Sequence, residues 1–413
     1  MKVRNLLRFL GVFMISIFVI LSFTGCSSNY NNIDKLAYVV ALGLDVGENH
    51  TLKLSFQISI PQSTDSKSGS SQSSDVIVNS VECSSISSGI NLMNSYISKK
   101  INLSHCKVVV FSEQLAYQGL SEYIYTLVND INISPSTNII ISKSNAKAFL
   151  ENAKPTTESL SARYYEIAPT SSEYTGYTAN VKIGTFFSNI LDTFSEPFAI
   201  LGSVNNEQTH NNHSNNSVNQ DSSYTAGETP LETSKTNIEN MGLAVFSKDK
   251  MVGELNGMET ICHLIVTNEL DTCIITIPSP FSSQETIDLQ LKMDKSTKKD
   301  LELVGSSPFI TVKAHLKATI LSMNENHNYL EEENLNLLEN YANAYLERNI
   351  SQYLYKTAKE LKSDISGFGK YMVSHFLTWD DWINSNWTAT FPNSFFSVEV
   401  QTNIRSAHLL LKT

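Results

Sequence analysis

A long polar segment divides this chain into two parts with different hydrophobic patterns. Residues 203–235, SVNNEQTHNNHSNNSVNQDSSYTAGETPLETSK, are rich in Asn, Ser and Thr and poor in apolar side chains. Such a segment cannot bury enough apolar surface to repay the entropy of ordering, so we expect residues 203–236 to form a disordered linker at the main domain boundary. His210 and His213 lie in it without a fixed third ligand, and we expect them to be solvated rather than metal-bound.

Before the linker, strand-like and helical patterns alternate, which predicts a mixed α/β domain over residues 26–202. LAYVVALGLDV (36–46) and TLKLSFQISI (51–60) have the alternation and β-branched content of paired strands. The polar run 61–75 is expected to be a loop. Further strands are expected at 105–112 and 138–144, and helices near 84–101, 117–131 and 145–153, the last with Asn145 as its N-cap.

After the linker, over residues 237–413, the pattern is richer in strands with one solvated face. MGLAVFSKDKMVGELNG (241–257) predicts a β-hairpin. A long amphipathic helix is expected from Glu331 to about Ser363. A short helix is expected at 258–268 and strands at 273–280, 285–293, 308–323 and 395–411. The whole chain therefore predicts an α+β fold of several small mixed α/β domains.

The N-terminus has the layout of a secretory signal. Basic Lys2, Arg4 and Arg8 precede an apolar run, residues 10–23, and no acidic residue occurs before Cys26. A membrane-spanning helix needs about 20 apolar residues, so this run is short for that role. The order of a basic region and a short apolar region is typical of a cleaved signal.

The end of the apolar run indicates where the signal is cut. FTGC places small Thr24 and Gly25 before Cys26 and resembles a bacterial lipobox, in which the thiol is acylated and the chain is cleaved just before it. Phe23 stands where that motif usually has leucine or another aliphatic residue. We expect residues 1–25 to be a lipoprotein signal peptide and Cys26 to carry diacylglycerol and an N-acyl chain, two anchors that hold more firmly than one. An uncleaved signal anchor and ordinary secretion are the alternatives.

The charge of the chain restricts its partners. It has 30 Lys and Arg against 41 Asp and Glu, a net charge of −11, and loss of the basic signal region makes the mature chain more acidic still. Phosphate backbones and anionic lipid head groups repel such a surface, which argues against nucleic acid as a ligand and against electrostatic docking on a membrane. Attachment should therefore depend on the lipid, with the body outside the bilayer.

The remaining cysteines give no sign of a metal or redox site. Cys83, Cys106, Cys262 and Cys273 form no CxxC pair and no Cys/His cluster with zinc spacing. A disulfide is permitted outside the cytoplasm, and one between Cys262 and Cys273 is an alternative. We expect all four to be small buried apolar residues.

Three passages, together with the lipobox and the ALGLD strand, form a combination typical of one family. They are CKVVVFSEQLAYQGLSEYIYTLVNDINISPSTNIIISK (106–143), MGLAVFSKDKMVGELNGMET (241–260) and LKSDISGFGKYM (361–372), the last followed by Trp379, Trp387 and Phe391. In order, and over nearly the whole chain, they resemble the Ger(x)C proteins, the lipid-anchored C subunits of nutrient germinant receptors in endospore-forming bacteria. Ser366 stands where that family's loop often has an aromatic residue.

The resemblance implies a fold, a location and a set of partners. The fold is an α+β arrangement of several small domains rather than an enzyme fold. The partners are two polytopic membrane subunits, one of them transporter-like, at the outer face of the spore inner membrane. The chain would then be a non-enzymatic lipoprotein of spore germination, with no direct nutrient binding and no cofactor beyond the lipid on Cys26.

Catalytic motifs are weak in this sequence. Asp380 and Asp381 lie between Trp379 and Trp382, and carboxylates beside aromatic rings occur in sugar-cleaving sites. Neighbouring residues point apart on a strand or a helix, so we expect a helix start with solvated acids and packed indoles. No GxSxG or HExxH motif is present, and GFG (367–369) is expected to cap the long helix. We therefore predict no catalytic and no metal site.

The remaining predictions concern the hairpin tip, a helix cap and alternative functions. Lys248, Asp249 and Lys250 are expected at the solvated tip of the hairpin, and their alternative role is a docking contact for a partner subunit. Ser112 is expected to cap a helix that starts at Glu113. The alternative functions are a lipid-anchored solute-binding protein, which needs paired parallel α/β lobes around a cleft, and a cell-wall hydrolase that acts through its adjacent aspartates.

Overall fold

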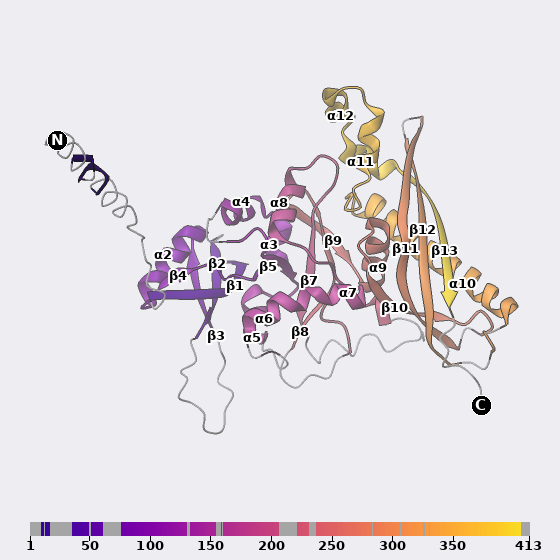
Figure 1. Ribbon diagram of the computed structural model, residues 1–413, viewed down its shortest axis with the longest axis horizontal. Coiled ribbons are helices and arrows are strands. Elements are labelled where there is room, and N and C mark those ends of the chain that lie inside the picture. Colours follow the sequence, from indigo (N-terminus) through magenta and orange to yellow (C-terminus); the bar gives the residue numbers. More distant parts are fainter. Residues whose placement is uncertain are drawn as a thin grey trace, which may run out of the picture.

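Two β-sheets lie side by side along the long axis of the molecule, the N-terminal sheet at one end and the C-terminal sheet at the other (Figure 1). This arrangement confirms the predicted mixed α/β class. The fold is seen in a computed structural model. It describes residues 10–11, 13–16, 35–48, 51–60, 76–129, 133–153, 158, 160–205, 221–230, 237–282, 284–305, 307–324, 327–329 and 331–405.

The N-terminal sheet has nine strands with a parallel centre and antiparallel flanks. Its order is β3-β2-β1-β5-β6-β7-β8-β9, and β4 pairs with β1 off this path. The pairs β1–β5, β5–β6 and β6–β7 are parallel. The strands β3, β4 and β7 lie where no strand was predicted. The bounds are β1 (Leu36–Val46), β2 (Leu52–Ser59), β3 (Val76–Cys83), β4 (Lys100–Asn102), β5 (Val108–Ser112), β6 (Asn138–Ser142), β7 (Phe198–Val204), β8 (Ile238–Ser247) and β9 (Lys250–Leu255).

Some helices of this half begin where a side chain accepts one of their first amides. Asn145 accepts the Ala148 amide at 2.6 Å and Ser112 the Leu115 amide at 3.4 Å, which confirms both predicted caps. The buried Asp45 carboxylate accepts the first amides of α5, at 2.6 and 3.0 Å. The helices are α2 (Ile86–Tyr96), α3 (Glu113–Gln118), α4 (Ser121–Asn129), α5 (Ala146–Asn152), α6 (Ser161–Ile167), η3 (Ala168–Ser171), α7 (Ser172–Thr175), α8 (Ile183–Leu191) and η5 (Asp221–Ser223).

The polar segment does not separate the two sheets. β8 follows it in the chain and pairs with β7, so the first sheet continues past the segment. Residues 221–230 are packed as well: the Ala226 amide donates to the Met241 carbonyl at 3.0 Å, and the Gly257 amide donates to the Tyr224 carbonyl at 3.1 Å. The prediction of a linker disordered throughout 203–236 is therefore wrong for these residues. Residues 206–220 and 231–236 lie outside the described part of the chain.

The C-terminal half is built on a long hairpin whose inner face is covered by helices. In β12, buried and exposed residues alternate, which confirms strands with one solvated face. The buried helix α9 packs on β8 and β9 as well as on β11 and β12, so it joins the two sheets. The elements are α9 (Gly257–Thr267), β10 (Thr272–Pro278), β11 (Thr286–Val304), β12 (Ser307–Met323), α10 (Glu332–Tyr355), η6 (Lys356–Glu360), α11 (Gly369–Met372), η7 (Val373–His375), α12 (Trp379–Ser385), α13 (Trp387–Thr390), η8 (Phe391–Asn393) and β13 (Phe395–Arg405).

The long helix ends earlier than predicted and not at the GFG glycines. After Tyr355 it widens into the π-helical turn η6, and Lys362 leaves it with a φ of 53°. Gly369 has another role, because a Cβ there would lie 2.5 Å from the Phe194 carbonyl oxygen. The glycine therefore lets this loop pack closely on the segment before β7.

The four described cysteines are buried and free, as predicted. Burial raises the pKa of the Cys106 thiol to about 12, so it stays protonated. Cys26 and nearly all of the expected signal peptide lie outside the described residues. Among the residues that are described, we find no helix with the length and apolar character needed to cross a membrane.

Candidate functional site at the β8–β9 hairpin tip

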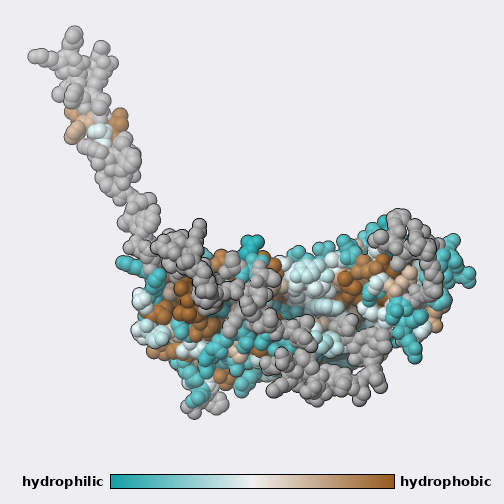
Figure 2. Space-filling model, turned by 90° about the horizontal axis from the view of Figure 1, so that it is seen from below, coloured by the Kyte–Doolittle hydropathy of each residue, from teal (hydrophilic) through white to brown (hydrophobic). Residues whose placement is uncertain are grey.

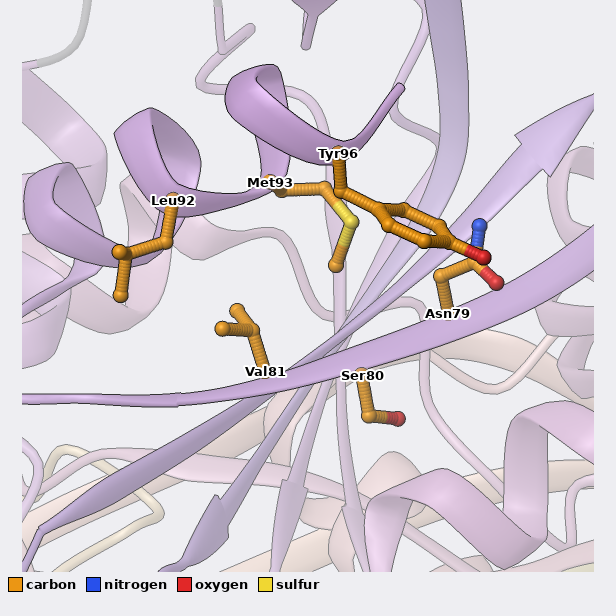
Figure 3. Close-up of a pocket in the computed structure, with 6 residues that line it drawn as sticks. All are labelled: Asn79, Ser80, Val81, Leu92, Met93 and Tyr96. Carbon is orange, nitrogen blue, oxygen red and sulfur yellow. The ribbon is translucent and has the colours of Figure 1, made fainter.

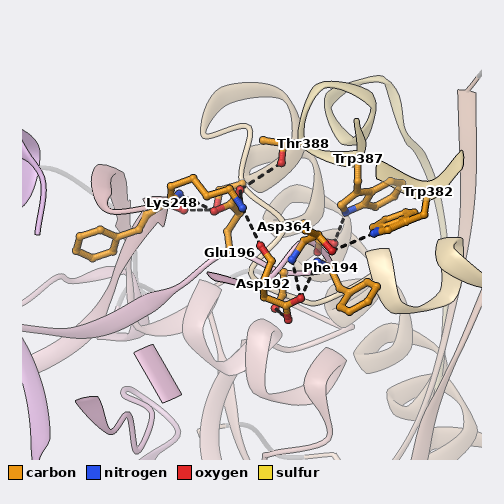
Figure 4. A network of polar contacts seen from close by, with 12 residues as sticks. Asp192, Phe194, Glu196, Lys248, Asp364, Trp382, Trp387 and Thr388 are labelled. Carbon is orange, nitrogen blue, oxygen red and sulfur yellow. Dashed lines mark hydrogen bonds and ion pairs between the residues drawn. The ribbon is translucent and has the colours of Figure 1, made fainter. Parts of the chain in front are cut away.

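The tip of the β8–β9 hairpin is held by other parts of this chain rather than solvated on all sides. Lys248 turns the chain with a φ of 55°. Its amide donates to Glu196 Oε2 at 2.6 Å, and its Nζ donates to the Asp192 carbonyl at 2.8 Å (Figure 4). Lys248 is thus fixed to the segment before β7.

Asp249 joins the same tip to the start of α4. Its carbonyl accepts the Leu120 amide at 2.9 Å, and its carboxylate accepts the Ser121 amide at 3.2 Å. A carboxylate at this place also suits the positive end of the helix dipole. Lys250 is exposed and begins β9 opposite Ser247. Of the three predicted contact residues, the first two are therefore already bonded within the chain.

Glu196 is a buried acid beside the tip. Its side chain is nearly inaccessible, and besides the Lys248 amide it receives the Thr388 hydroxyl at 3.4 Å. Burial raises the pKa of this carboxyl, and the Lys248 amide and ammonium oppose the shift. The Glu196 carboxylate therefore links the hairpin tip to the C-terminal helices by hydrogen bonds.

Asp364 is a second buried acid, and a backbone hydrogen bond links it to Glu196. Its carbonyl accepts the Glu196 amide, and its Oδ2 accepts the Gly369 amide and the Trp387 Nε1–H, each at 2.9 Å. Its Oδ1 is buried without a hydrogen-bond partner. Burial raises the pKa of the Asp364 carboxyl to about 6, against the lowering effect of these donors.

Aromatic rings close this junction. Phe194 stacks on Trp382 with centroids 5.5 Å apart, and the Trp382 Nε1–H donates to the Thr193 hydroxyl at 3.0 Å (Figure 4). The ring centroids of Trp387 and Phe391 are 5.6 Å apart. Polar groups are thus surrounded by rings that exclude water, which makes each hydrogen bond harder to break.

The arrangement is suited to holding elements together rather than to reaction chemistry. Each buried acid accepts donors of this chain, although Asp364 Oδ1 has no hydrogen-bond partner. Within the described ranges, no group of three or more His, Cys, Asp or Glu side chains is placed to hold a metal ion. The hydrogen bonds of these residues join the hairpin tip to the segment before β7 and to the C-terminal helices.

The adjacent acids lie at a helix start, as predicted. Asp380 and Asp381 are exposed in the first turn of α12, and Asp381 bonds to its N-cap Thr378 through both its amide and its carboxylate. Trp382 is buried as expected, but Trp379 is 57% exposed, so only one of the two flanking indoles is fully packed.

A buried polar chain links α9, α10 and the loop that follows. His263 Nδ1 lies 2.8 Å from the Tyr353 hydroxyl, which lies 2.7 Å from the Ser366 hydroxyl. Burial lowers the pKa of His263 to about 3, so the ring is neutral. Ser366, the departure from the family pattern, therefore contributes a hydrogen bond where an aromatic ring would contribute packing.

Sequence reasoning missed the acids that organise this junction. Glu196 and Asp364 are isolated in sequence, and nothing in a local pattern shows that they are buried. The available signal was indirect: Glu196 stands beside a proline between apolar residues, and Asp364 lies inside one of the three passages that carry the family resemblance.

Two family models cover the two halves of the chain. The model described as spore germination protein N-terminal domain matches residues 29–203, and the model described as spore germination B3/GerAC like, C-terminal, matches residues 241–408. The chain belongs to the Ger(x)C family of spore germination proteins. The three passages that resemble this family meet at the junction, since they supply Ser121, Lys248 and Asp364.

Relatives and a solved structure match over nearly their full lengths. The Bacillus subtilis (strain 168) protein YfkR is 19% identical over 396 residues, with 94% of each chain covered. Spore germination protein B3 of the same organism is 20% identical over 397 residues, which cover 95% of this chain and 96% of that protein. The crystal structure of the GerBC protein superposes with a TM-score of 0.52 at 16% identity, covering 88% of this chain and 96% of that one, which indicates a common fold.

Proposed function

We propose that this Ger(x)C protein is the lipid-anchored C subunit of a nutrient germinant receptor, a non-enzymatic component that assembles with polytopic membrane subunits. The observation that carries the proposal is the match of both family models, in order, to the two halves of the chain. The lipobox at Cys26 supports the anchor, and the resemblance supports a place at the outer face of the spore inner membrane.

Anchoring gives the proposal its physical basis. A lipidated protein is confined to a thin layer at the bilayer, so its effective concentration near membrane subunits is high. Weak protein surfaces can then assemble without large individual affinities. The closed junction at the hairpin tip supports an assembly role, because its acids bind groups of this chain rather than a substrate.

Substitution of Cys26 tests the proposal. Cys26→Ala removes the acylated thiol, so the protein should leave the membrane fraction and nutrient-triggered germination should fall, while the circular dichroism spectrum stays unchanged. Ser27→Ala is the matched control and should be retained. Normal membrane retention together with normal nutrient response in Cys26→Ala would contradict the proposal.

A solute-binding role finds less support in the fold. Parallel strands with helical crossovers occupy the centre of the first sheet, whereas the second sheet is antiparallel except for β12 and β13. Calorimetry of the mature protein in detergent against amino acids and sugars separates the two functions. Micromolar binding of one of them would favour the solute-binding protein.

A further inference from the structure

Apart from the short strand β4, the outer strands of the two sheets in the described chain are β3, β9, β10 and β13. At β10 the helix α7 packs on the strand, which ends in Pro278. At β9 the helix α3 packs on the strand and α4 holds its tip. At β13, side chains of α10 accept the outward amides: Glu339 from Ile404 (2.8 Å), Asn343 from Thr402 (2.7 Å) and Glu347 from Val400 (2.9 Å).

The fourth outer strand, β3, is open in the described part of the chain, where it pairs only with β2. Natural proteins usually protect such an edge with charged residues, proline or a bulge. Residues 76–81 contain no charged residue and no proline, and the pairing with β2 runs without a register shift. Glu82, at the end of the strand, accepts the Glu48 amide and the Thr51 hydroxyl, each at 3.2 Å. Within the described residues, the outer backbone groups of β3 therefore remain available to another strand.

An apolar pocket of about 320 Å³ opens beside this edge, under the helix α2. Leu92, Met93 and Tyr96 of the helix face Asn79 and Val81 of β3 across it (Figure 3). Leu92 is 46% exposed and Tyr96 is 77% exposed. Apolar surface is also visible at this end of the body in Figure 2. Apolar side chains of α2 thus lie beside the unpaired edge of β3.

We propose that β3 and this pocket bind an extended segment of a membrane-spanning partner by strand addition. The open backbone groups of β3 would pair with the segment, and alternate side chains of the segment would point to the α2 side, next to the pocket. Neither the pocket residues nor the helix α2 carries a charge at neutral pH. The segment that fits is therefore uncharged, with an apolar side chain at the pocket.

The position of β3 argues for a partner in the membrane. Val39 near the start of β1 lies opposite Ile58 of β2, which lies opposite Ile77 of β3, so the start of β1 is about 10 Å from the open edge. Only residues 27–34 separate Cys26 from Lys35, and even a fully extended chain would span roughly 32 Å there. An anchor at Cys26 therefore keeps the β3 edge within reach of the extracytoplasmic loops of a membrane protein.

This inference rests on the proposed function, because the short tether requires the lipid on Cys26. A photo-reactive benzoylphenylalanine at Ile77, which is 43% exposed, tests it in spores. The expected adduct, identified by mass spectrometry, joins the benzoylphenylalanine at position 77 to an extracytoplasmic segment of a polytopic subunit. Ile274 is the matched control, since it is 44% exposed on β10, an outer strand of the other sheet, and should give no such adduct.

A charge at the edge tests the same surface without a cross-linker. Ile77→Lys should slow nutrient-triggered germination by about tenfold, the effect of losing a well-buried interface contact, with the protein still in the membrane and its melting temperature unchanged. Ile77→Val should restore the response because it keeps an apolar β-branched side chain. Ile274→Lys should leave germination unchanged.

The outcomes separate this inference from the function on which it rests. Adducts only to a second copy of this chain, only to lipid, or to nothing would each overturn strand addition to a membrane partner, as would normal germination of Ile77→Lys. These results leave the receptor role intact if Cys26→Ala still releases the protein. Retention and full activity of Cys26→Ala would instead remove the receptor role.

Discussion

The outer strands β13 and β3 differ in what lies against their outward backbone groups. Each ends a sheet and leaves a row of backbone groups without a strand partner. On β13, acceptors spaced one helical turn apart on α10 bind every second amide. On β3, the described chain supplies no such acceptors, and the residues that line the pocket beside it are uncharged.

The difference separates a surface closed by the fold from one left for another molecule. The β13 seal uses residues at i, i+4 and i+8 of one helix, which share a face, so a single rigid helix places all three acceptors. A single helix bonds the outer edge of β13, whereas the outer edge of β3, next to the expected anchor, has no strand partner in the described chain. That asymmetry favours a binding role for the N-terminal end and a structural role for the C-terminal end.

Removing the β13 seal should have the largest effect on stability. Glu339→Ala, Asn343→Ala and Glu347→Ala together would leave three half-buried amides without acceptors, and each lost partner costs roughly 1–3 kcal/mol. We expect the free energy of unfolding to fall by about 3–9 kcal/mol in urea titrations.

The control for this experiment keeps the acceptors. Glu339→Gln and Glu347→Gln retain a carbonyl oxygen at each position, so we expect unfolding within about 1 kcal/mol of the parent protein. If the alanine variant were equally stable, the bonds of α10 to β13 would contribute nothing, and the contrast with β3 would disappear.

The pH dependence of stability should show a second feature of the closed end. Burial raises the pKa of Asp364 to about 6 from an ordinary value of 3.8, so the folded protein holds this proton more tightly than the unfolded chain. The stability from this group is complete below pH 4 and is lost as the pH rises through 6. A shift of about two units corresponds to roughly 3 kcal/mol.

Asp364→Asn removes that titration and keeps an oxygen for the Gly369 and Trp387 donors. The loss of unfolding free energy between pH 4 and pH 7 should therefore be smaller in the variant by roughly 3 kcal/mol. Burial lowers the pKa of Lys299, and its attraction to the Asp364 carboxylate opposes that shift. Identical pH profiles for the two proteins would show that Asp364 ionises freely.

The sequence predicted elements well where the signal was local. The caps at Ser112 and Asn145, the β8–β9 hairpin and the one-sided strand β12 all follow from turn chemistry or alternation. The strand β3 was missed because VIVNSVEC is partly exposed on both faces and lacks clean alternation.

Tertiary contacts decided the rest. Residues 221–230 look like linker in composition, yet backbone bonds to Met241 and Gly257 hold them on the fold. The junction acids come from positions far apart in sequence, with Glu196 and Thr388 bonded to each other across the chain. A local sequence pattern contains no information on which distant residues come into contact. The family resemblance located their neighbourhoods without giving their roles.

Lys248 gives the smallest expected change and tests whether the hairpin tip is closed like β13 or open like β3. Its side chain is 47% exposed, so its bond to the Asp192 carbonyl and its 3.9 Å ion pair with Glu196 should together contribute about 0.5–1 kcal/mol. Lys248→Ala should lower the free energy of unfolding by that amount. Lys248→Gly should lower it less, because glycine relieves the positive φ of 55°. Germination should follow stability in both variants if the tip serves only the fold, whereas a germination defect at unchanged stability would make this residue a docking contact for a partner subunit.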